Sequence, residues 1–316
     1  MQLNRPCGRL IVKWGLLFDE EHPVKRSLND LERMDVPMSK TLPVGIQVYG
    51  LRDLLENTPE NFADVMRKVK EIGYDGVELA GLYGLEPAFV KKTLDEIGLI
   101  PISAHVPFVD MMEDLDKVIS DYQTIGVKFL VMPYMAEEYR PVNPEGFQKF
   151  LPMLCEVGKK IHDAGMTFLY HNHDFEFVKL PDGEYGYDAM FSAIPADSLK
   201  CELDTCWCDV ATGMPNEFMA KYAGRLPVVH LKDYIKKGQV KNMYKLIGVE
   251  TEDDGGDTGY FGFRPVGFGM MIWEPILQSS LDAGAEWVIV EQDEHYELDP
   301  LEAARRSREY LKILGW

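Results

Sequence analysis

The chain has 316 residues, 46% of them hydrophobic and 11% aromatic, which provides a large packed core and excludes a wholly disordered protein. Its 52 acidic and 33 basic residues give a formal net charge of −19, and such a surface repels the phosphate backbone of nucleic acid. No apolar run is long enough to span a membrane, and the apolar patch at 10–18 is interrupted by Lys13, so we expect no membrane partner and no signal peptide. Five cysteines without zinc-finger spacing agree with a cytoplasmic location.

Residues 1–40 have mixed charge and no sustained hydrophobic periodicity, and we treat them as an N-terminal extension of unknown role. From 41 to 316 the chain repeats an apolar run, a loop, an amphipathic stretch and a glycine. The predicted strands are 44–50, 76–80, 101–105, 128–133, 167–176, 199–204, 228–233 and 287–293. The predicted helices are 58–72, 86–96, 115–124, 144–164, 187–193, 215–223, 274–283 and 300–314.

This alternation predicts an α/β protein with a (β/α)8 TIM-barrel fold over residues 41–316. The strands are apolar on both faces, as parallel strands buried in a barrel should be. An open doubly wound sheet is the alternative, but no Gly-x-Gly-x-x-Gly motif follows the first strand. The long insertion at about 235–271, rich in glycine and aromatic residues, is predicted to be an active-site lid.

The last predicted strands end in residues of the metal-ligand type. Asp204 ends the sixth strand, His230 lies in the seventh and Glu291 in the eighth. Alone, Asp204 would be read as a helix cap and His230 as a buried core histidine. In a parallel barrel, however, the carboxyl ends of the strands meet at one face, and buried carboxylates need a partner. Together these residues predict a site for one divalent cation.

The fifth strand supplies the fourth ligand, and two interpretations are open. We predict that Glu176 is the ligand and that His171 and His173 face the substrate or carry protons. In the other interpretation one of the two histidines is the ligand. Mixed nitrogen and oxygen ligation suits manganese, magnesium, cobalt or zinc.

Four further residues are candidates for substrate binding. His105 ends the third strand and could bind a substrate hydroxyl or make a structural hydrogen bond. Lys232 could reach the substrate at the rim or pair with Asp233. Trp207 and Tyr49 could form the apolar wall on which a sugar ring packs, or belong to the core.

Six segments together resemble a known family, namely Gln47–Tyr49 with Arg52, Ser103–His105, Tyr170–Glu176, Glu202–Trp207, His230–Asp233 and Val290–Asp293. They are similar to the xylose isomerase-like barrels known as sugar phosphate isomerases/epimerases, over nearly all of 44–316. The resemblance implies a TIM barrel with a divalent cation held by Glu176, Asp204, His230 and Glu291. It also implies a small-molecule sugar or keto-sugar as substrate, a role in carbohydrate metabolism and a possible homo-oligomer.

The resemblance further implies a metal-dependent sugar isomerase or epimerase. Its reaction would begin with removal of a proton next to a carbonyl, and the cation would stabilise the enediolate. Glu176 or Glu291 would be the base, and the other carboxylate, His171 or His173 would return the proton. Because no phosphate-cradling glycine loop is evident, we favour an unphosphorylated substrate.

Three alternatives are retained. The first is a keto-sugar dehydratase, or a keto-glycoside or C-glycoside lyase, that uses the same site with His171 or His173 as the acid. A more remote one is an enzyme resembling the abasic-site endonucleases, which the negative charge disfavours. Another remote one is a non-catalytic sugar-binding protein, which would require a broken ligand set.

Overall fold

The computed structural model describes residues 41–55, 58–238, 240, 243 and 259–316, and the predicted extension at 1–40 lies outside them. Within this part of the chain, eight parallel strands close into a barrel, which confirms the predicted TIM-barrel fold. Around the barrel they follow the chain order, and the last strand pairs with the first. The strands are β1 (Val44–Gln47), β2 (Gly76–Ala80), β3 (Ile100–His105), β4 (Phe129–Met132), β5 (Thr167–His171), β6 (Lys200–Asp204), β7 (Val228–Leu231) and β10 (Trp287–Val290).

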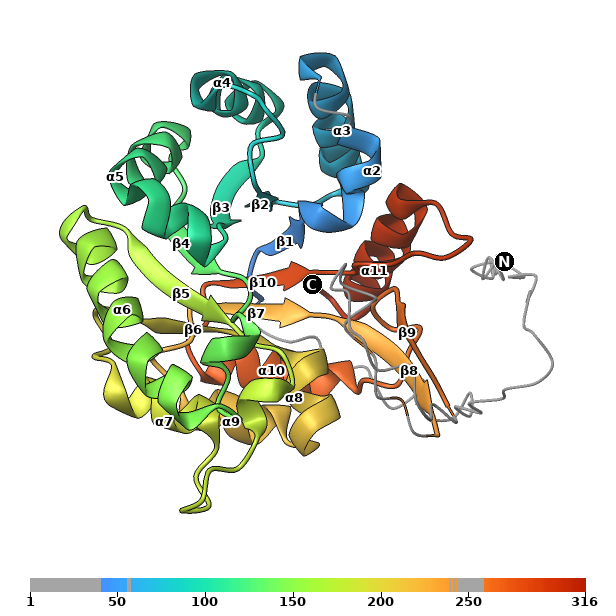
Figure 1. The fold of residues 1–316 in the computed structure, drawn as a ribbon. Coiled ribbons are helices and arrows are strands. Elements are labelled where there is room, and N and C mark those ends of the chain that lie inside the picture. The colour runs from blue at the N-terminus through green and yellow to red at the C-terminus, as the bar shows by residue number, and fades with distance from the viewer. Residues whose placement is uncertain (1–40, 56–57, 239, 241–242, 244–258) are drawn as a thin grey trace, which may run out of the picture. The chain divides into compact units, whose positions relative to one another are not determined.

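Helices surround these strands (Figure 1). Several of them end at or beside a glycine. Gly73 and Gly126 adopt the left-handed conformation, with φ of 105° and 90°, that lets the chain turn into the next strand. The helices are α2 (Arg52–Leu55), α3 (Pro59–Ile72), α4 (Pro87–Ile97), α5 (Phe108–Ile125), α6 (Pro144–Asp163), α7 (Gly186–Ala193), α8 (Thr205–Thr212), α9 (Pro215–Lys221), α10 (Trp273–Asp282) and α11 (Pro300–Ile313). Short 3-10 turns are η1 (Val48–Leu51), η2 (Glu137–Tyr139) and η3 (Phe175–Phe177). Among the described residues, no helix has both the length and the apolar character needed to cross a membrane.

A layer of apolar side chains fills the barrel. Its members come from five strands and are almost completely buried; they are Ile102, Phe129, Val131, Leu169, Val228 and Ile289. Successive side chains of a strand point to opposite faces, so the residue two positions later faces the interior again. Two positions after Leu169, Val228 and Ile289 the sequence has histidine, histidine and glutamate. The apolar layer is therefore followed by a polar layer at the carboxyl ends of the strands.

The fifth strand differs from the prediction, because it ends at His171 and not at residue 176. The Asn172 side chain explains this end. Its amide donates to the Asp204 carbonyl (3.2 Å) and accepts from the Asp204 N–H (3.0 Å), so a side chain replaces the next backbone pair of the ladder. The chain then leaves the sheet and forms η3, which carries Glu176.

Three other elements also differ from the prediction. Helix α8 was not predicted and begins directly after β6. Helix α5 begins seven residues earlier than expected, at Phe108, and is kinked at Asp114. The predicted lid contains an antiparallel hairpin, β8 (Asp233–Lys237) and β9 (Tyr260–Arg264), while 239, 241–242 and 244–258 lie outside the described residues.

Candidate metal centre

The carboxyl ends of four neighbouring strands carry a candidate metal centre. One potential ligand comes from each of β5, β6 and β7, and one directly follows β10; they are His171, Asp204, His230 and Glu291. All four side chains are buried, and their ligand atoms lie within 4.8 Å of one another. Two imidazole nitrogens and two carboxylate oxygens form a donor set that suits a divalent transition metal.

The spacing of the ligand atoms fits a single ion. His171 Nε2 lies 4.0 Å from Asp204 Oδ2 and 4.0 Å from Glu291 Oε2. His230 Nδ1 lies 2.8 Å from Glu291 Oε2. Metal–ligand bonds of about 2.0–2.2 Å place two ligands of one ion at most about 4.4 Å apart. Only small side-chain adjustments are therefore needed.

Asp204 forms the helix cap that its sequence position suggested and keeps one carboxylate oxygen without a hydrogen bond among the described residues. Its Oδ1 accepts a hydrogen bond from the Trp207 N–H (2.8 Å) and caps α8. Its Oδ2 is buried and makes no hydrogen bond with the described residues. Burial raises the pKa of Asp204 to about 6, against the opposing effect of Lys232. The cap thus fixes the carboxylate and leaves one oxygen available to a cation.

Lys232 places a buried ammonium group beside the centre. Its Nζ lies 2.9 Å from Glu291 Oε2, 2.8 Å from Asp293 Oδ2 and 3.4 Å from Asp204 Oδ2. Burial lowers the pKa of Lys232, but Asp293, Glu291 and Asp204 outweigh it and raise this pKa well above the ordinary value. The ammonium therefore stays charged and neutralises part of the acidic cluster.

A second polar group lies against the two histidine ligands and consists of Glu78, His105 and Glu202. Glu202 Oε2 lies 2.8 Å from His105 Nε2 and 3.2 Å from His171 Nδ1. Glu78 Oε1 lies 2.8 Å from His230 Nε2 and 3.0 Å from His105 Nε2. Burial lowers the pKa of His105, but the two carboxylates outweigh it and raise this pKa to about 10. Each histidine ligand thus faces the centre with one ring nitrogen and a carboxylate with the other.

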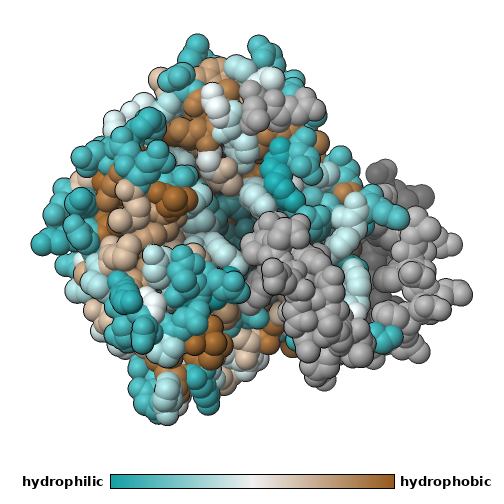
Figure 2. All heavy atoms as spheres, in the orientation of Figure 1, coloured by the Kyte–Doolittle hydropathy of each residue, from teal (hydrophilic) through white to brown (hydrophobic). Residues whose placement is uncertain are grey.

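A cavity of about 450 Å³ opens onto the centre. It contains ligands of the centre together with His105, His173, Lys232 and Asp293, while aromatic rings and prolines form its walls. In the described part of the chain its lining is Tyr49, Ala80, Gly81, His105, Pro107, Asp110, Pro133, Tyr134, His171, His173, Lys232, Glu291 and Asp293. The space-filling view shows a hollow with hydrophilic residues near the middle of one face, over the barrel strands (Figure 2).

Glu176, the predicted fourth ligand, lies in a different environment. Its Oε1 accepts a hydrogen bond from the Tyr170 hydroxyl (2.5 Å), and its Oε2 accepts one from the His173 N–H (2.8 Å). Burial raises the pKa of Glu176 to about 8. The group of four ligand atoms contains His171 in its place, which is the other interpretation that the sequence left open.

The predicted substrate-binding residues are divided between the cavity and its surroundings. Tyr49, His105 and Lys232 line the cavity. Trp207 is fully buried and packs behind the cavity, with its ring 5.5 Å from that of His173 and 5.7 Å from Lys232 Nζ. His173 lines the cavity, and its buried Nδ1 makes no hydrogen bond with the described residues.

Asp233 holds together the two ends of the insertion that follows β7. Its carboxylate accepts hydrogen bonds from the backbone N–H groups of 234, 267, 269 and 271 and from the Trp273 indole, at 2.9–3.1 Å. A Cβ atom at Gly269 would lie 2.1 Å from Asp233 Oδ1, so the close approach requires glycine there. The segment 267–271 is thereby fixed next to Lys232.

Sequence reasoning missed Asp293, suggested only a place at the barrel mouth for Glu78, and left Glu202 open between a role beside Asp204 and a surface position. The position of Asp293 could have indicated its role, because it lies two residues after Glu291 and, in an extended chain, points to the same side. Glu202 has the same relation to Asp204. Glu78 had a weaker signal, a single carboxylate in an apolar strand, whose partners lie on other strands and are fixed only by the barrel register.

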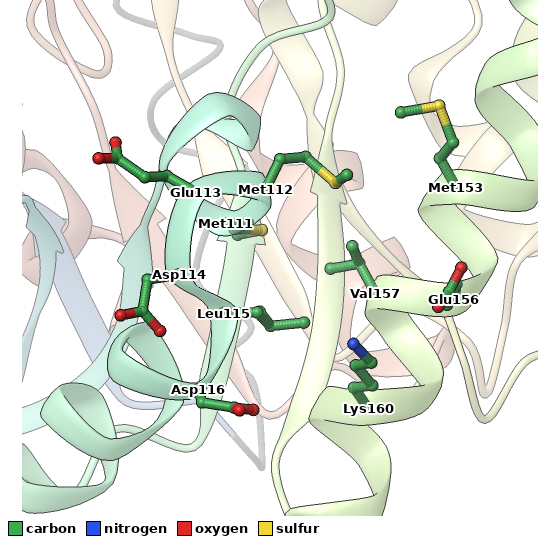
Figure 3. Close-up of a pocket in the computed structure, with 10 residues that line it drawn as sticks. All are labelled: Met111, Met112, Glu113, Asp114, Leu115, Asp116, Met153, Glu156, Val157 and Lys160. Carbon is green, nitrogen blue, oxygen red and sulfur yellow. The ribbon is translucent and has the colours of Figure 1, made fainter.

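A second hollow, of about 300 Å³, lies between α5 and α6 (Figure 3). Leu115 of α5 and Val157 of α6 point towards each other there, and Glu113 lies at its edge. Its described lining consists of apolar side chains, carboxylates and one lysine, without a histidine. The residues with acid–base and ligand chemistry gather at the barrel mouth, and we place the functional site there.

Several solved structures have the same fold. A sugar phosphate isomerase/epimerase from Parabacteroides distasonis is 20% identical, with a TM-score of 0.66 over 88% of this chain and 96% of that chain. The probable 3-DHS dehydratase AsbF from Bacillus anthracis is 14% identical, with a TM-score of 0.66 over 86% and 99%. A xylose isomerase-like TIM barrel protein from Mycobacterium smegmatis in complex with magnesium is 17% identical, with a TM-score of 0.61 over 87% and 97%. At these identities the likeness establishes the fold.

No curated protein matches the sequence. The family model of the xylose isomerase-like TIM barrel matches residues 66–314, which include β2 to α11 and thus every ligand of the candidate centre. This protein therefore belongs to the family of xylose isomerase-like TIM barrels.

Proposed function

We propose that the protein is a divalent-metal-dependent sugar isomerase or epimerase that removes a proton from the carbon next to a carbonyl group. The observation that carries the proposal is the convergence of His171, Asp204, His230 and Glu291 at a cavity that also contains a buried ammonium group. A divalent cation bound by these four residues would polarise the carbonyl oxygen of a sugar and so lower the barrier to loss of the neighbouring proton.

Glu291 is the base that we propose. It lines the cavity, unlike Glu176, which is bonded to Tyr170 and His173. Burial raises the pKa of Glu291, but Lys232 and His230 outweigh it and hold this pKa well below the ordinary value. The carboxylate is therefore ionised and can accept a proton, and exclusion of water from the cavity would have to strengthen it as a base.

His173 is the group that we propose returns the proton. Its ring lines the cavity, and its Nδ1 is buried and without a hydrogen bond among the described residues. Burial and Lys232 lower the pKa of His173 well below the ordinary value. The neutral ring would therefore take up a proton from solvent through the cavity before delivering it to the substrate, while Glu291 releases the proton that it removed to solvent. Lys232, which stays protonated, would stabilise negative charge that develops on a substrate oxygen.

The cavity favours an uncharged sugar. Its described lining contains three carboxylates, Asp110, Glu291 and Asp293, and its one ammonium group, from Lys232, is already paired with two of them. A bound divalent cation would in turn be balanced by Asp204 and Glu291. His105, whose pKa is also raised, lies 2.8 Å from Glu202 and 3.0 Å from Glu78, so both cationic side chains of the described lining already have carboxylate partners. We therefore propose an unphosphorylated ketose or keto-sugar.

A dehydratase or lyase that acts on a keto-sugar or keto-glycoside is the second candidate. The position of His173 favours it, because this residue could also protonate a leaving group at the carbon next to the one that loses its proton. The two candidates share the first proton transfer. An enzyme of the abasic-site endonuclease type is disfavoured by the net charge of −19. A cytoplasmic location, a role in carbohydrate metabolism and a homo-oligomer remain predictions.

Exchange of a substrate C–H proton with solvent deuterium tests the proposal. Neutral ketoses and 3-keto-glucosides are incubated in D2O with protein loaded with Mn²⁺, Co²⁺, Mg²⁺ or Zn²⁺, and with chelated protein. We expect deuterium at the carbon next to the carbonyl with the loaded protein only, and loss of the exchange in Glu291→Gln. Accumulated isomers would identify an isomerase or epimerase, and elimination products a lyase. Metal-loaded protein that binds a sugar without exchange would instead identify the non-catalytic sugar-binding protein.

A further inference from the structure

Two groups of potential ligand atoms share the same two histidines. The first is the candidate metal centre, and the second consists of His105, His171, Glu202 and His230. His171 contributes Nε2 to the first group and Nδ1 to the second, whereas His230 contributes Nδ1 to the first and Nε2 to the second. The two groups thus use opposite nitrogens of the same two rings.

A neutral imidazole has one lone pair and one N–H group. If His171 Nε2 and His230 Nδ1 are bound to an ion, then His171 Nδ1 and His230 Nε2 carry protons. A carboxylate oxygen lies close to each of these two nitrogens. His171 Nδ1 makes a hydrogen bond to Glu202 Oε2 (3.2 Å), and His230 Nε2 approaches Glu78 Oε1 at 2.8 Å.

We propose that Glu78 and Glu202 are positioning residues, which select the ring nitrogens of His230 and His171 that face the cation. The second group then holds protons in place of a second ion, so that the chain binds one ion beside Asp204 and Glu291. This inference rests on the metal centre of the proposed function. It adds how the orientation and the protonated nitrogen of each histidine ligand are fixed.

Glu78 is itself fixed from several sides, and Glu202 is fixed by burial and by its contact with His105. Glu78 accepts hydrogen bonds from Gln47 Nε2 (2.7 Å) and Ser103 Oγ (2.5 Å), and both glutamates contact His105. Glu78 and Glu202 are completely buried on different strands of the barrel. A carboxylate held in this way cannot follow a rotated imidazole, and so it fixes the orientation of the ring.

Metal affinity measures this effect directly. Removal of an outer carboxylate that orients a histidine ligand typically costs about 10- to 100-fold in metal affinity. We expect Mn²⁺ titration, followed by electron paramagnetic resonance, to give one ion per chain in the wild type. Glu202→Gln and Glu78→Gln should each weaken binding by about 10-fold or more. Asp188→Asn is the matched control, since Asp188 is a buried carboxylate paired with Tyr222 and Lys221 away from the centre, and it should bind as the wild type does.

The ring nitrogens can also be observed in the wild type, which keeps the test valid if a variant does not fold. In Zn²⁺-loaded protein, ¹⁵N NMR should show protonated Nδ1 in His171 and protonated Nε2 in His230. Two ions per chain, the opposite tautomers, or unchanged affinity in both glutamine variants would overturn the inference.

The outcomes also separate this inference from the proposed function. A wild type that binds no metal overturns both. Deuterium exchange together with unchanged affinity in the variants overturns only the positioning role. Weakened binding in the variants without any exchange by the loaded wild type overturns only the proposed reaction.

Discussion

Lys232 Nζ and Glu291 Oε2 lie 2.9 Å apart, and the same carboxylate oxygen lies 2.8 Å from His230 Nδ1. One potential ligand atom is thus shared between an internal ammonium group and an imidazole. The acidic cluster of the centre is therefore partly neutralised by the protein itself, and a bound cation has to share Glu291 with Lys232.

Lys232→Met should therefore bind Mn²⁺ more tightly, by about tenfold, which corresponds to about 1.4 kcal/mol of relieved repulsion. The metal-free variant should be less stable by about 3–5 kcal/mol, because Asp293 loses its buried partner. Metal titration and denaturant unfolding measure the two effects. Lys128→Met, which removes an exposed lysine paired with Glu286, should change neither property by a comparable amount, and weaker metal binding in Lys232→Met would refute the competition.

The fourth ligand can be assigned by comparing His171→Ala with Glu176→Gln. His171 belongs to the group of four ligand atoms, whereas Glu176 is bonded to Tyr170 and His173. We expect elemental analysis to find about one ion per chain in Glu176→Gln and none in His171→Ala. Asp204→Ala and His230→Ala should also lose the metal. The reverse result for the first pair would restore Glu176 as the ligand.

Glu176 should also make stability depend on pH. Burial raises its folded-state pKa from 4.5 to about 8, so the folded protein holds a proton that the unfolded chain has lost between these values. Its stabilising contribution is complete below pH 4.5 and falls as pH rises towards 8, by up to about 4 kcal/mol. Urea unfolding at pH 5 and pH 8 should show a smaller pH-dependent loss in Glu176→Gln than in the wild type. An equal loss in both proteins would show that Glu176 does not titrate in this way.

The charge of the cavity can be altered at its rim through Asp110, which is exposed on α5. The wild type should prefer a neutral ketose over its phosphate monoester by about tenfold or more in kcat/KM. Asp110→Lys should lower KM for the phosphate ester and leave that for the neutral sugar nearly unchanged. Glu113→Lys makes the same change of charge on the same helix, at the other hollow, and is the control (Figure 3). A wild type that prefers the phosphate ester would exclude a neutral substrate.

Asp233→Asn should destabilise the segment 267–271. The amide offers one acceptor oxygen where the carboxylate offers two, so buried N–H groups lose partners at a cost of about 1–3 kcal/mol each. Denaturant unfolding measures the stability, and hydrogen exchange of the Gly267, Gly269 and Met271 amides locates the change. Unaltered protection of these amides would show that the carboxylate does not hold the segment.

Much of the fold could be predicted because local signals agreed with it. Gly73 and Gly126 end helices where the sequence placed them, and all eight barrel strands lie within predicted runs or one residue beyond. The end of β5 could not be predicted, because it depends on hydrogen bonds between Asn172 and the backbone of a neighbouring strand. Helix α8 follows so closely on β6 that no loop marks its start.

The site was predictable to the extent that strand register determines it. Asp204, His230 and Glu291 stand at strand ends that a barrel brings together, and the structure brings them together. The choice between His171 and Glu176 depends on where β5 ends and so required the structure. The contact of Glu78 on β2 with His230 on β7 crosses the barrel, which no sequence spacing reveals.

The hydrogen bonds of Asp233 have a consequence for how this barrel can diversify. They connect residues on both sides of the insertion to one carboxylate, directly after Lys232. The tip of the insertion can therefore change in length or composition while its base keeps the same distance from the ammonium group. The insertion can thus vary between β8 and β9 while the residues that anchor its base to the barrel stay the same.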